Sequence, residues 1–162
     1  MSFLAAFLIC LTAAAFEGLC AGRDPMDKLR ALCQPRWSPP VWLWMLIGIG
    51  WYAICFTTLV RLLPDWPEHE APVLLLAALM LANGGANFFQ FRLERLDLAF
   101  LYLFPYWVLL AAFLWTACPL DRLTCLLFAP YGAYQLYAAA WGYRLWQFNP
   151  RPPRQSGQTC SE

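Results

Sequence analysis

Residues 35–52 read PRWSPPVWLWMLIGIGWY, a stretch in which a loop rich in proline and tryptophan turns into an uninterrupted apolar run. Pro39 and Pro40 suit the first turn of a helix, because the fixed φ of proline matches that turn and its missing N–H would lack a partner there. Ser38, directly before them, is the expected N-cap. The stretch therefore predicts a membrane-spanning helix. The aromatic loop before it is expected to lie at the mouth of a pocket within the membrane protein.

The composition of the whole chain agrees with a membrane protein. Of 162 residues, 61% are hydrophobic and 13% are charged, whereas soluble domains carry about 25% charged residues. A formal net charge of +1 gives no basic excess to neutralise phosphates, so nucleic-acid binding is not expected. With one histidine and seven scattered cysteines, no metal site is expected, and cysteines in the apolar runs are interpreted as small hydrophobic residues.

Apolar stretches of membrane-spanning length follow one another along the chain, separated by short polar loops. We expect an all-α integral membrane bundle of five transmembrane helices in residues 1–150, with spans at about 2–20, 39–63, 72–91, 96–117 and 124–148. The first is expected to be a helix and not a signal peptide, because no positive charge precedes it. The segment DPMDKLRAL in the loop after it can form a short helix. Residues 151–162 are expected to be a disordered cytoplasmic tail.

The basic residues are unevenly distributed between the two sides of this arrangement. One side would carry Arg23, Lys28, Arg30, Arg36, Arg92, Arg95, Arg144, Arg151 and Arg154. The other side would carry Arg61 and Arg122. Because cytoplasmic loops are enriched in lysine and arginine, we expect the N-terminus outside and the C-terminus in the cytoplasm. A helical bundle also favours the inner, cytoplasmic membrane over an outer membrane, where β-barrels dominate.

Two of the expected spans carry aromatic residues along one helical face. In the second span this face consists of Trp44, Gly48, Trp51 and Cys55. In the fifth span it consists of Tyr134, Ala138, Trp141 and Leu145. The small residue within each face would leave room for a flat apolar molecule between the rings. The alternative is that the rings form an interfacial belt or face lipid, as tryptophans near helix ends commonly do.

The third span contains the segment ANGGAN, whose asparagines are costly in a membrane unless they bond to another helix or face a cavity. The polar residues Asn83, Asn87 and Gln90 share one helical face. We expect these three side chains to form hydrogen bonds to neighbouring helices, in preference to direct contact with a ligand. A ladder of small residues would also allow close approach of a second copy, and we expect a homodimer interface at Ala78, Ala82 and Ala86.

Residues of the usual catalytic types are scarce in the expected spans. Glu17 is the one convincing carboxylate inside a span, and the sequence contains no evident Ser/His/Asp constellation, phosphate-binding loop or pair of carboxylates. A proton-coupled pump needs ionisable residues along its path, so that class is disfavoured. We therefore expect no catalytic residue and no required cofactor.

Taken together, these motifs resemble the translocator protein family, also called the tryptophan-rich sensory proteins (TspO/MBR), from the first helix to Pro150. The resemblance rests on PRWSPPVW with Tyr52 twelve residues after Pro40, on Asn83 followed by aromatics at Phe88, Phe89 and Phe91, and on APYGAYQLYAAAWGYRLWQFNP. It implies a bundle of five helices, usually dimeric, with a cavity that opens towards the first loop and binds porphyrins, haem, sterols or drug-like ligands. By position, the implied pocket residues are Trp37, Pro39, Pro40, Trp42, Trp51, Asn83, Phe91, Tyr134, Ala138 and Trp141.

The chain departs from the family pattern inside the implied pocket. Gly48 and Ala86 stand where the family has tryptophans in the second and third helices, and Tyr134 replaces a tryptophan of the fifth. Tyr102 matches an acidic position of the fourth helix, and Gly142 matches an asparagine of the fifth. Some family members break down protoporphyrin in light with the participation of pocket tryptophans, so these losses argue against that activity and predict a reshaped pocket.

The sequence thus predicts a membrane protein that binds a planar hydrophobic ligand for sensing, sequestration or transport. A porphyrin or haem is the leading ligand and a sterol-like molecule the second. Aromatic rings would stack on the ligand, and Arg30 and Arg36 would pair with its carboxylates at the cytoplasmic mouth. The alternatives are an enzyme that oxidises or photodegrades porphyrin and a structural or assembly subunit of a membrane complex.

Overall fold

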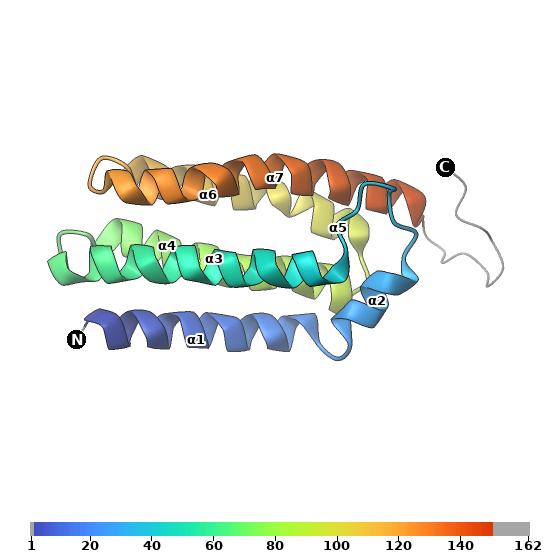
Figure 1. The fold of residues 1–162 in the computed structure, drawn as a ribbon, viewed down its shortest axis with the longest axis horizontal. Coiled ribbons are helices and arrows are strands. Elements are labelled where there is room, and N and C mark those ends of the chain that lie inside the picture. The colour runs from blue at the N-terminus through green and yellow to red at the C-terminus, as the bar shows by residue number, and fades with distance from the viewer. Residues whose placement is uncertain (1, 151–162) are drawn as a thin grey trace.

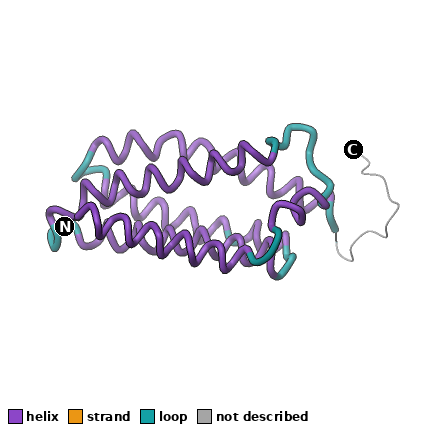
Figure 2. The backbone as a smooth tube through the Cα atoms, turned by 60° about the horizontal axis from the view of Figure 1, so that its bottom comes forward, coloured by secondary structure: helices purple, strands orange, loops and turns teal. Residues whose placement is uncertain are grey.

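The computed structural model describes residues 2–150, and this part of the chain folds into a helical bundle without strands (Figure 1). Its long helices are α1 (Ser2–Ala21), α3 (Val41–Leu62), α4 (Glu70–Asn87), α6 (Leu103–Ala117) and α7 (Arg122–Phe148). Its short elements are α2 (Pro25–Ala31), η1 (Leu63–Asp65), η2 (Phe88–Arg92) and α5 (Leu96–Leu101). Figure 2 shows that the loops lie at the two ends of the bundle. The tail expected at 151–162 lies outside the described residues.

Four helical stretches within residues 2–150 are long and apolar enough to cross a membrane, namely Ser2–Ala21, Val41–Asp65, Glu70–Arg92 and Leu96–Ala117. Their ends agree with four of the expected spans to within about two residues. Helix α7 is not among them although it has 27 residues, enough for about 40 Å, because polar residues such as Gln135 and Arg144 lower its hydropathy. The all-helical architecture is confirmed, and the fifth crossing stays a prediction.

The expected first turn of the second span is wrong. Helix α3 begins at Val41, and Pro40 is its N-cap, with an extended backbone at ψ 154°. The Ser38 hydroxyl does not cap the helix, because it donates to Gln34 Oε1 at 2.7 Å and accepts from Trp141 Nε1 at 2.9 Å. Pro39 precedes another proline and is therefore kept out of the helical region. The Ser38-Pro39-Pro40 segment thus remains part of the loop and is bonded to α7.

The fourth expected span is interrupted at Tyr102, where α5 ends and α6 begins. Pro105 explains the interruption, since proline has no N–H to offer the carbonyl four residues earlier, at Leu101. A second irregularity is η2, a π-helical turn in which the N–H of Leu93 bonds to the carbonyl of Phe88 at 3.0 Å. Both irregularities lie in the half of the bundle away from the N-terminus (Figure 1).

The other half of the bundle, which we call the closed half, holds the most tightly packed core. Its fully buried side chains come from α3, α4, α6 and α7 and include Leu59, Leu62, Leu76, Leu79, Phe113 and Phe128. The ring centroids of Phe113 and Phe128 are 4.8 Å apart. Ala6, Cys10 and Ala13 of α1 are buried in the same cluster, so the closed half joins five long helices around one continuous apolar core.

The turn between α6 and α7 contains several polar and covalent links. Asp121 caps α7 by accepting from the backbone N–H groups of Leu123 and Thr124, and it also receives two hydrogen bonds of 2.7 Å from Arg61 of α3. The hydrogen bonds from Arg61 and Thr124 hold the pKa of Asp121 well below its usual range. A disulfide joins Cys118 to Cys125. That bridge corrects the interpretation of Cys125, which lies in the fifth expected span, as a small hydrophobic residue. Cys10, Cys20 and Cys55 are buried free thiols.

The two glycines of ANGGAN serve helix packing. A Cβ added at Gly84 would lie 2.9 Å from Phe16 Cδ1 and 3.3 Å from the Glu17 Cα, and one added at Gly85 would lie 2.8 Å from the Tyr102 hydroxyl. Glycine at these positions therefore allows α4 to approach α1 on one side and Tyr102 on the other.

Candidate functional site

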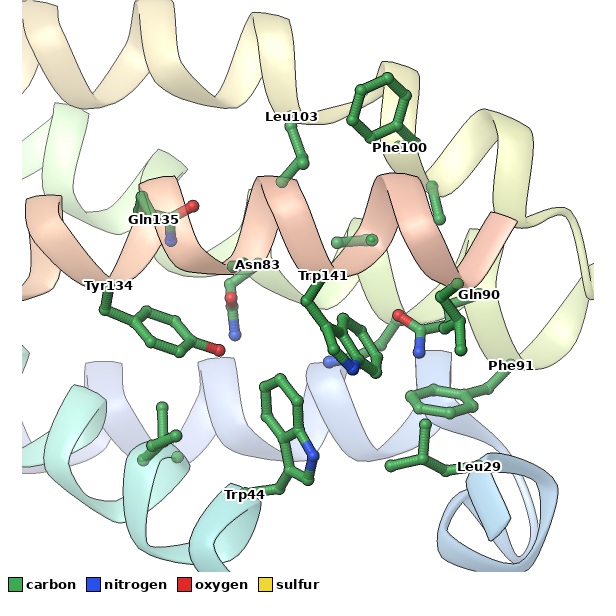
Figure 3. A pocket seen from close by; sticks show the side chains of 18 of the residues that line it. Leu29, Trp44, Asn83, Gln90, Phe91, Phe100, Leu103, Tyr134, Gln135 and Trp141 are labelled. Carbon is green, nitrogen blue, oxygen red and sulfur yellow. The ribbon is translucent and has the colours of Figure 1, made fainter. Parts of the chain in front are cut away.

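The half of the bundle towards α2 and α5, which we call the open half, contains a cavity of about 270 Å³. Its wall comes mainly from α3, α4, α5 and α7, with contributions from α1, α2, η2 and α6. Figure 3 shows Trp44 of α3 and Trp141 of α7 next to each other in the cavity, with Tyr134, Asn83 and Gln90 close by. Ligand pockets usually measure about 300–1,000 Å³, so this cavity lies just below the usual range.

Small residues on the facing helices create the cavity. Its wall includes Gly48, Ala86, Ala99, Ala138 and Gly142. A Cβ added at Gly48 would meet no atom within 4 Å, which shows open space at that position. Gly48, Ala86 and Gly142 are also positions at which the sequence was expected to depart from the resembled pattern, and each contributes a small residue to the wall.

The aromatic faces of α3 and α7 meet, but their rings contact each other. The centroids of Trp44 and Trp141 are 4.7 Å apart, and those of Trp44 and Tyr134 are 6.4 Å apart. Deeper in the bundle, Trp51 stacks on Tyr131 at 4.3 Å with an interplanar angle of 25°. The rings of Trp44 and Trp141 therefore contact each other and leave no open slot between them.

Glu17 of α1 brings a carboxylate to the wall of the cavity. Its Oε2 accepts from the Tyr52 hydroxyl and its Oε1 accepts from Asn87 Nδ2, both at 2.7 Å. These bonds connect α1 to α3 and α4, so Asn87 has the interhelical role expected for it. Asn83 and Gln90 also line the cavity, but their side chains form no hydrogen bond with any other residue in the range 2–150, and they are available to a ligand.

Two buried polar atoms of the wall have no hydrogen-bond partner within residues 2–150. They are Gln135 Oε1 and Trp51 Nε1, and the two residues are only 7% and 4% exposed. A buried polar atom without a partner costs about 1–3 kcal/mol. A guest that supplies a donor to Gln135 and an acceptor to Trp51 would recover that cost.

The loop before α3 is bonded to the C-terminal part of α7. Trp141 Nε1 donates to Ser38, and the Tyr137 hydroxyl donates to the Trp37 carbonyl at 3.0 Å. The side chain of Asn149 also accepts from the Cys33 N–H at 2.9 Å and donates to the Cys33 carbonyl at 3.0 Å. The loop therefore lies against the C-terminal part of α7, and its course can be followed in Figure 1.

Most of the expected pocket residues come together in this cavity. Those in its wall are Trp51, Asn83, Phe91, Tyr134, Ala138 and Trp141. Those outside its wall are Trp37, Pro39, Pro40 and Trp42. Trp37 and Trp42 are 46% and 58% exposed. Trp37 belongs to the loop and packs edge-to-face on Tyr137 of α7 at 5.3 Å, and Trp42 belongs to the first turn of α3.

The arginines expected at the mouth and the alanines expected at a dimer contact do not lie together as the sequence predicted. Neither Arg30 nor Arg36 lines the cavity, and Arg30 forms an ion pair of 2.9 Å with Asp27. Ala78 is exposed, Ala82 packs against the closed-half core, and Ala86 lines the cavity. The three alanines therefore do not form one continuous outer face, and dimerisation stays a prediction.

Several wall residues were not singled out as ligand contacts from the sequence, among them Glu17, Trp44, Tyr131 and Gln135. The sequence did contain a feature that could have identified two of them. Trp44 shares the helical face of Trp51, and Gln135 is an amide in the middle of a long helix, where a polar side chain usually faces a cavity or another helix.

The comparisons with known proteins agree with this architecture. A family model described as the TspO/MBR family matches residues 6–147, which run from the first turns of α1 almost to the end of α7. The comparison with curated proteins gave no match.

Proposed function

This chain belongs to the TspO/MBR family, and on that premise we propose that it is a membrane protein that binds a planar hydrophobic ligand for sensing, sequestration or transport. The family and the four apolar helices make it an integral membrane protein. The proposed site is the cavity of the open half.

The observation that carries the proposal is the composition of the cavity wall. Trp44, Trp51, Tyr134 and Trp141 supply ring faces from α3 and α7, and planar apolar molecules stack on such faces. The unpartnered atoms of Gln135 and Trp51 supply polar contacts that can orient a guest. An apolar cavity with a few convergent polar groups is the usual form of a small-molecule site.

A porphyrin or haem is the ligand class that we test first, with a sterol-like molecule second. A macrocycle needs more room than about 270 Å³, so its entry requires Trp44 to move away from Trp141. Breaking the hydrogen bond between Trp141 and Ser38 would free the Trp141 ring for the same purpose. Arg30 and Arg36 lie outside the wall, and we propose them only as partners for ligand carboxylates at the mouth.

We also propose five membrane crossings, with α7 as the fifth. The view in Figure 1 supports this, because α7 runs beside α6 along the length of the bundle. The end of the bundle that carries α2 and α5 is rich in basic residues. They are Arg23, Lys28, Arg30, Arg36, Arg92, Arg95 and Arg144. The positive-inside rule supports a cytoplasmic location for that end and an outer location for the N-terminus. A helical bundle favours insertion in the inner membrane over an outer membrane, where β-barrels dominate. A homodimer is proposed from the family resemblance alone.

The proposal is tested by titrating the purified protein in detergent with haem and with protoporphyrin, following the absorbance of the ligand. We expect saturable binding, and a Trp44→Ala, Trp141→Ala double variant should bind about tenfold more weakly or worse, because two stacking surfaces are lost. Trp115→Ala is the matched control, since Trp115 is 83% exposed on α6 and lies outside the cavity wall. Equal affinity of the double variant and the control would refute the site.

The same samples separate binding from breakdown. Loss of porphyrin absorbance under light at a rate above that of empty micelles would indicate the enzymatic alternative. A stable absorbance spectrum under light would favour binding.

A further inference from the structure

We propose that the cavity selects planar ligands that carry a cationic hydrogen-bond donor, such as a protonated amine, and that Glu17 binds this group. The inference rests on the proposed function, because it concerns the chemistry of the ligand in the same cavity. This ligand class differs from the porphyrins and haem expected from the sequence, because the ionisable side chains of those molecules are carboxylates and carry negative charge.

The charge of the cavity wall is the first observation. Among the residues that line the cavity, all of them within 2–150, Glu17 is the one with a formal charge, and none is a lysine, arginine or histidine. Three basic residues at this end of the bundle are engaged elsewhere: Lys28 pairs with Glu94, Arg95 pairs with Asp97, and Arg92 donates to the Leu19 carbonyl. Within the described residues, no ion pair includes Glu17.

The hydrogen bonds of Glu17 are the second observation. Each carboxylate oxygen receives one bond, from the Tyr52 hydroxyl and from Asn87 Nδ2. Both donors are neutral, so they orient the carboxylate without balancing its charge. An ionised carboxylate has about four acceptor positions, which leaves further acceptor capacity for a ligand. A charge in a membrane helix is costly unless it is paired, and a cationic ligand would supply the pair.

The neighbouring groups are complementary to the same kind of ligand. Gln135 Oε1 is a second acceptor without a partner, and Gln135 is 93% buried, being 7% exposed. The faces of Trp44 and Trp141 (Figure 3) attract cations through the negative potential of their rings. An acidic group, a free amide oxygen and indole faces around a small cavity form a site for a flat organic cation.

The test uses three ligands with the same three-ring skeleton: 9-aminoacridine, acridine and acridine-9-carboxylate. At mildly alkaline pH they are a cation with N–H donors, a neutral molecule and an anion. Binding to the purified protein in detergent is measured by ligand fluorescence or by isothermal titration calorimetry. We expect 9-aminoacridine to bind about tenfold more tightly than acridine, as a charge-assisted hydrogen bond implies, and the carboxylate to bind most weakly.

The variant Glu17→Gln keeps the size of the side chain and removes its charge. It should reduce the preference for 9-aminoacridine over acridine to less than about twofold, because the affinity for 9-aminoacridine falls more than the affinity for acridine. If Glu17 only connects the helices, Glu17→Gln will change the affinities of all three ligands by the same factor, and that result would overturn the inference.

Two further variants keep the test decisive if Glu17→Gln folds poorly. Gln135→Leu removes the second acceptor and should lower the preference for 9-aminoacridine by a smaller factor of about two to five. Tyr52→Phe removes a neutral donor from Glu17, and Tyr52 does not line the cavity, so the preference should stay or rise. A preference unchanged in Gln135→Leu and lost in Tyr52→Phe would contradict the proposed contacts.

Failure of this inference differs from failure of the proposed function. If acridine does not bind the unaltered protein and neither haem nor protoporphyrin binds, the planar-ligand function itself is refuted. If acridine binds but 9-aminoacridine has no advantage over it, the planar-ligand function stands and the cation site is refuted.

Discussion

The closed half and the open half of this bundle are made from the same long helices, yet one is solid and the other is hollow. In the closed half, leucine and phenylalanine side chains such as Leu79 and Phe113 fill the space completely. In the open half, the inner faces carry Gly48, Ala86 and Ala138, and polar groups face the space that is left. The difference teaches that small side chains at a few facing positions are what leaves the space between α3, α4 and α7 unfilled in the open half.

The closed half is therefore expected to determine the stability of the fold, and the open half is expected to determine ligand binding. A fully packed core loses both contacts and transfer energy when a side chain is cut, whereas a side chain beside a cavity has fewer contacts to lose. Substitutions in the closed half should therefore act on unfolding, and substitutions in the open half should act on ligands.

The largest expected effect follows from Phe113→Ala in the closed half. Phe113 is 0% exposed, so the change should lower the free energy of unfolding by about 3–5 kcal/mol. Trp44→Ala in the open half should cost clearly less and should weaken ligand binding instead. Denaturant unfolding in detergent, followed by circular dichroism, measures the first effect, and titration measures the second. If Phe113→Ala and Trp44→Ala lowered the free energy of unfolding equally, the two halves would not differ in their contribution to stability.

A matched pair of glycine substitutions gives the next effect. Gly84→Ala would place a methyl group 2.9 Å from Phe16 Cδ1 and 3.3 Å from the Glu17 backbone, and overpacking of this kind costs about 1–3 kcal/mol. Gly48→Ala meets no atom within 4 Å and should stabilise α3 by up to about 1 kcal/mol, because alanine loses less backbone entropy than glycine. Thermal unfolding of both variants should show shifts of opposite sign.

Asp121→Ala removes the N-cap of α7 and should cost about 1–2 kcal/mol at neutral pH. Because the pKa of Asp121 is depressed in the folded protein, its stabilisation is present above the unfolded pKa of about 3.9 and is lost as the pH falls further towards the folded pKa. The difference in melting temperature between the parent protein and the variant should therefore shrink as the pH is lowered below about 4. A difference that stays constant with pH would show that the carboxylate is not responsible.

The smallest effect is expected for Ser38→Ala, which removes the acceptor of the Trp141 indole. One neutral hydrogen bond contributes about 0.5–1.5 kcal/mol, so the melting temperature should fall only slightly. Ligand association, measured by stopped-flow fluorescence, should become faster because the Trp141 ring is released. Slower association would show that the bond between the loop and α7 holds the cavity open and does not restrict it.

Hydropathy and helical periodicity were sufficient to predict much of this molecule. They located four helices to within about two residues, the short helix α2 after Gly22, and the faces of α3 and α7 that meet at the cavity. These features depend on local composition and spacing, which can be read directly from the sequence.

Other features could not be predicted because they depend on residues far apart in the chain. The acceptor role of Glu17 requires Tyr52 and Asn87 on two other helices. The contact between Trp44 and Trp141 depends on how closely α3 approaches α7. The break at Tyr102 did have a local signal in Pro105, and the bridge between Cys118 and Cys125 had one in the short turn that separates them.

The π-helical turn at the end of α4 bears on how this chain tolerates insertions and deletions. A π turn is wider than the α turn it replaces and accommodates an additional residue, so deleting one residue from 88–92 would restore an α turn and leave both flanks in place. A deletion earlier in α4 would rotate one flank by about 100° and withdraw Asn83 or Phe91 from the cavity. Homologous chains should therefore differ in length at this turn, and an alignment gap placed elsewhere in α4 would pair cavity residues with lipid-facing ones.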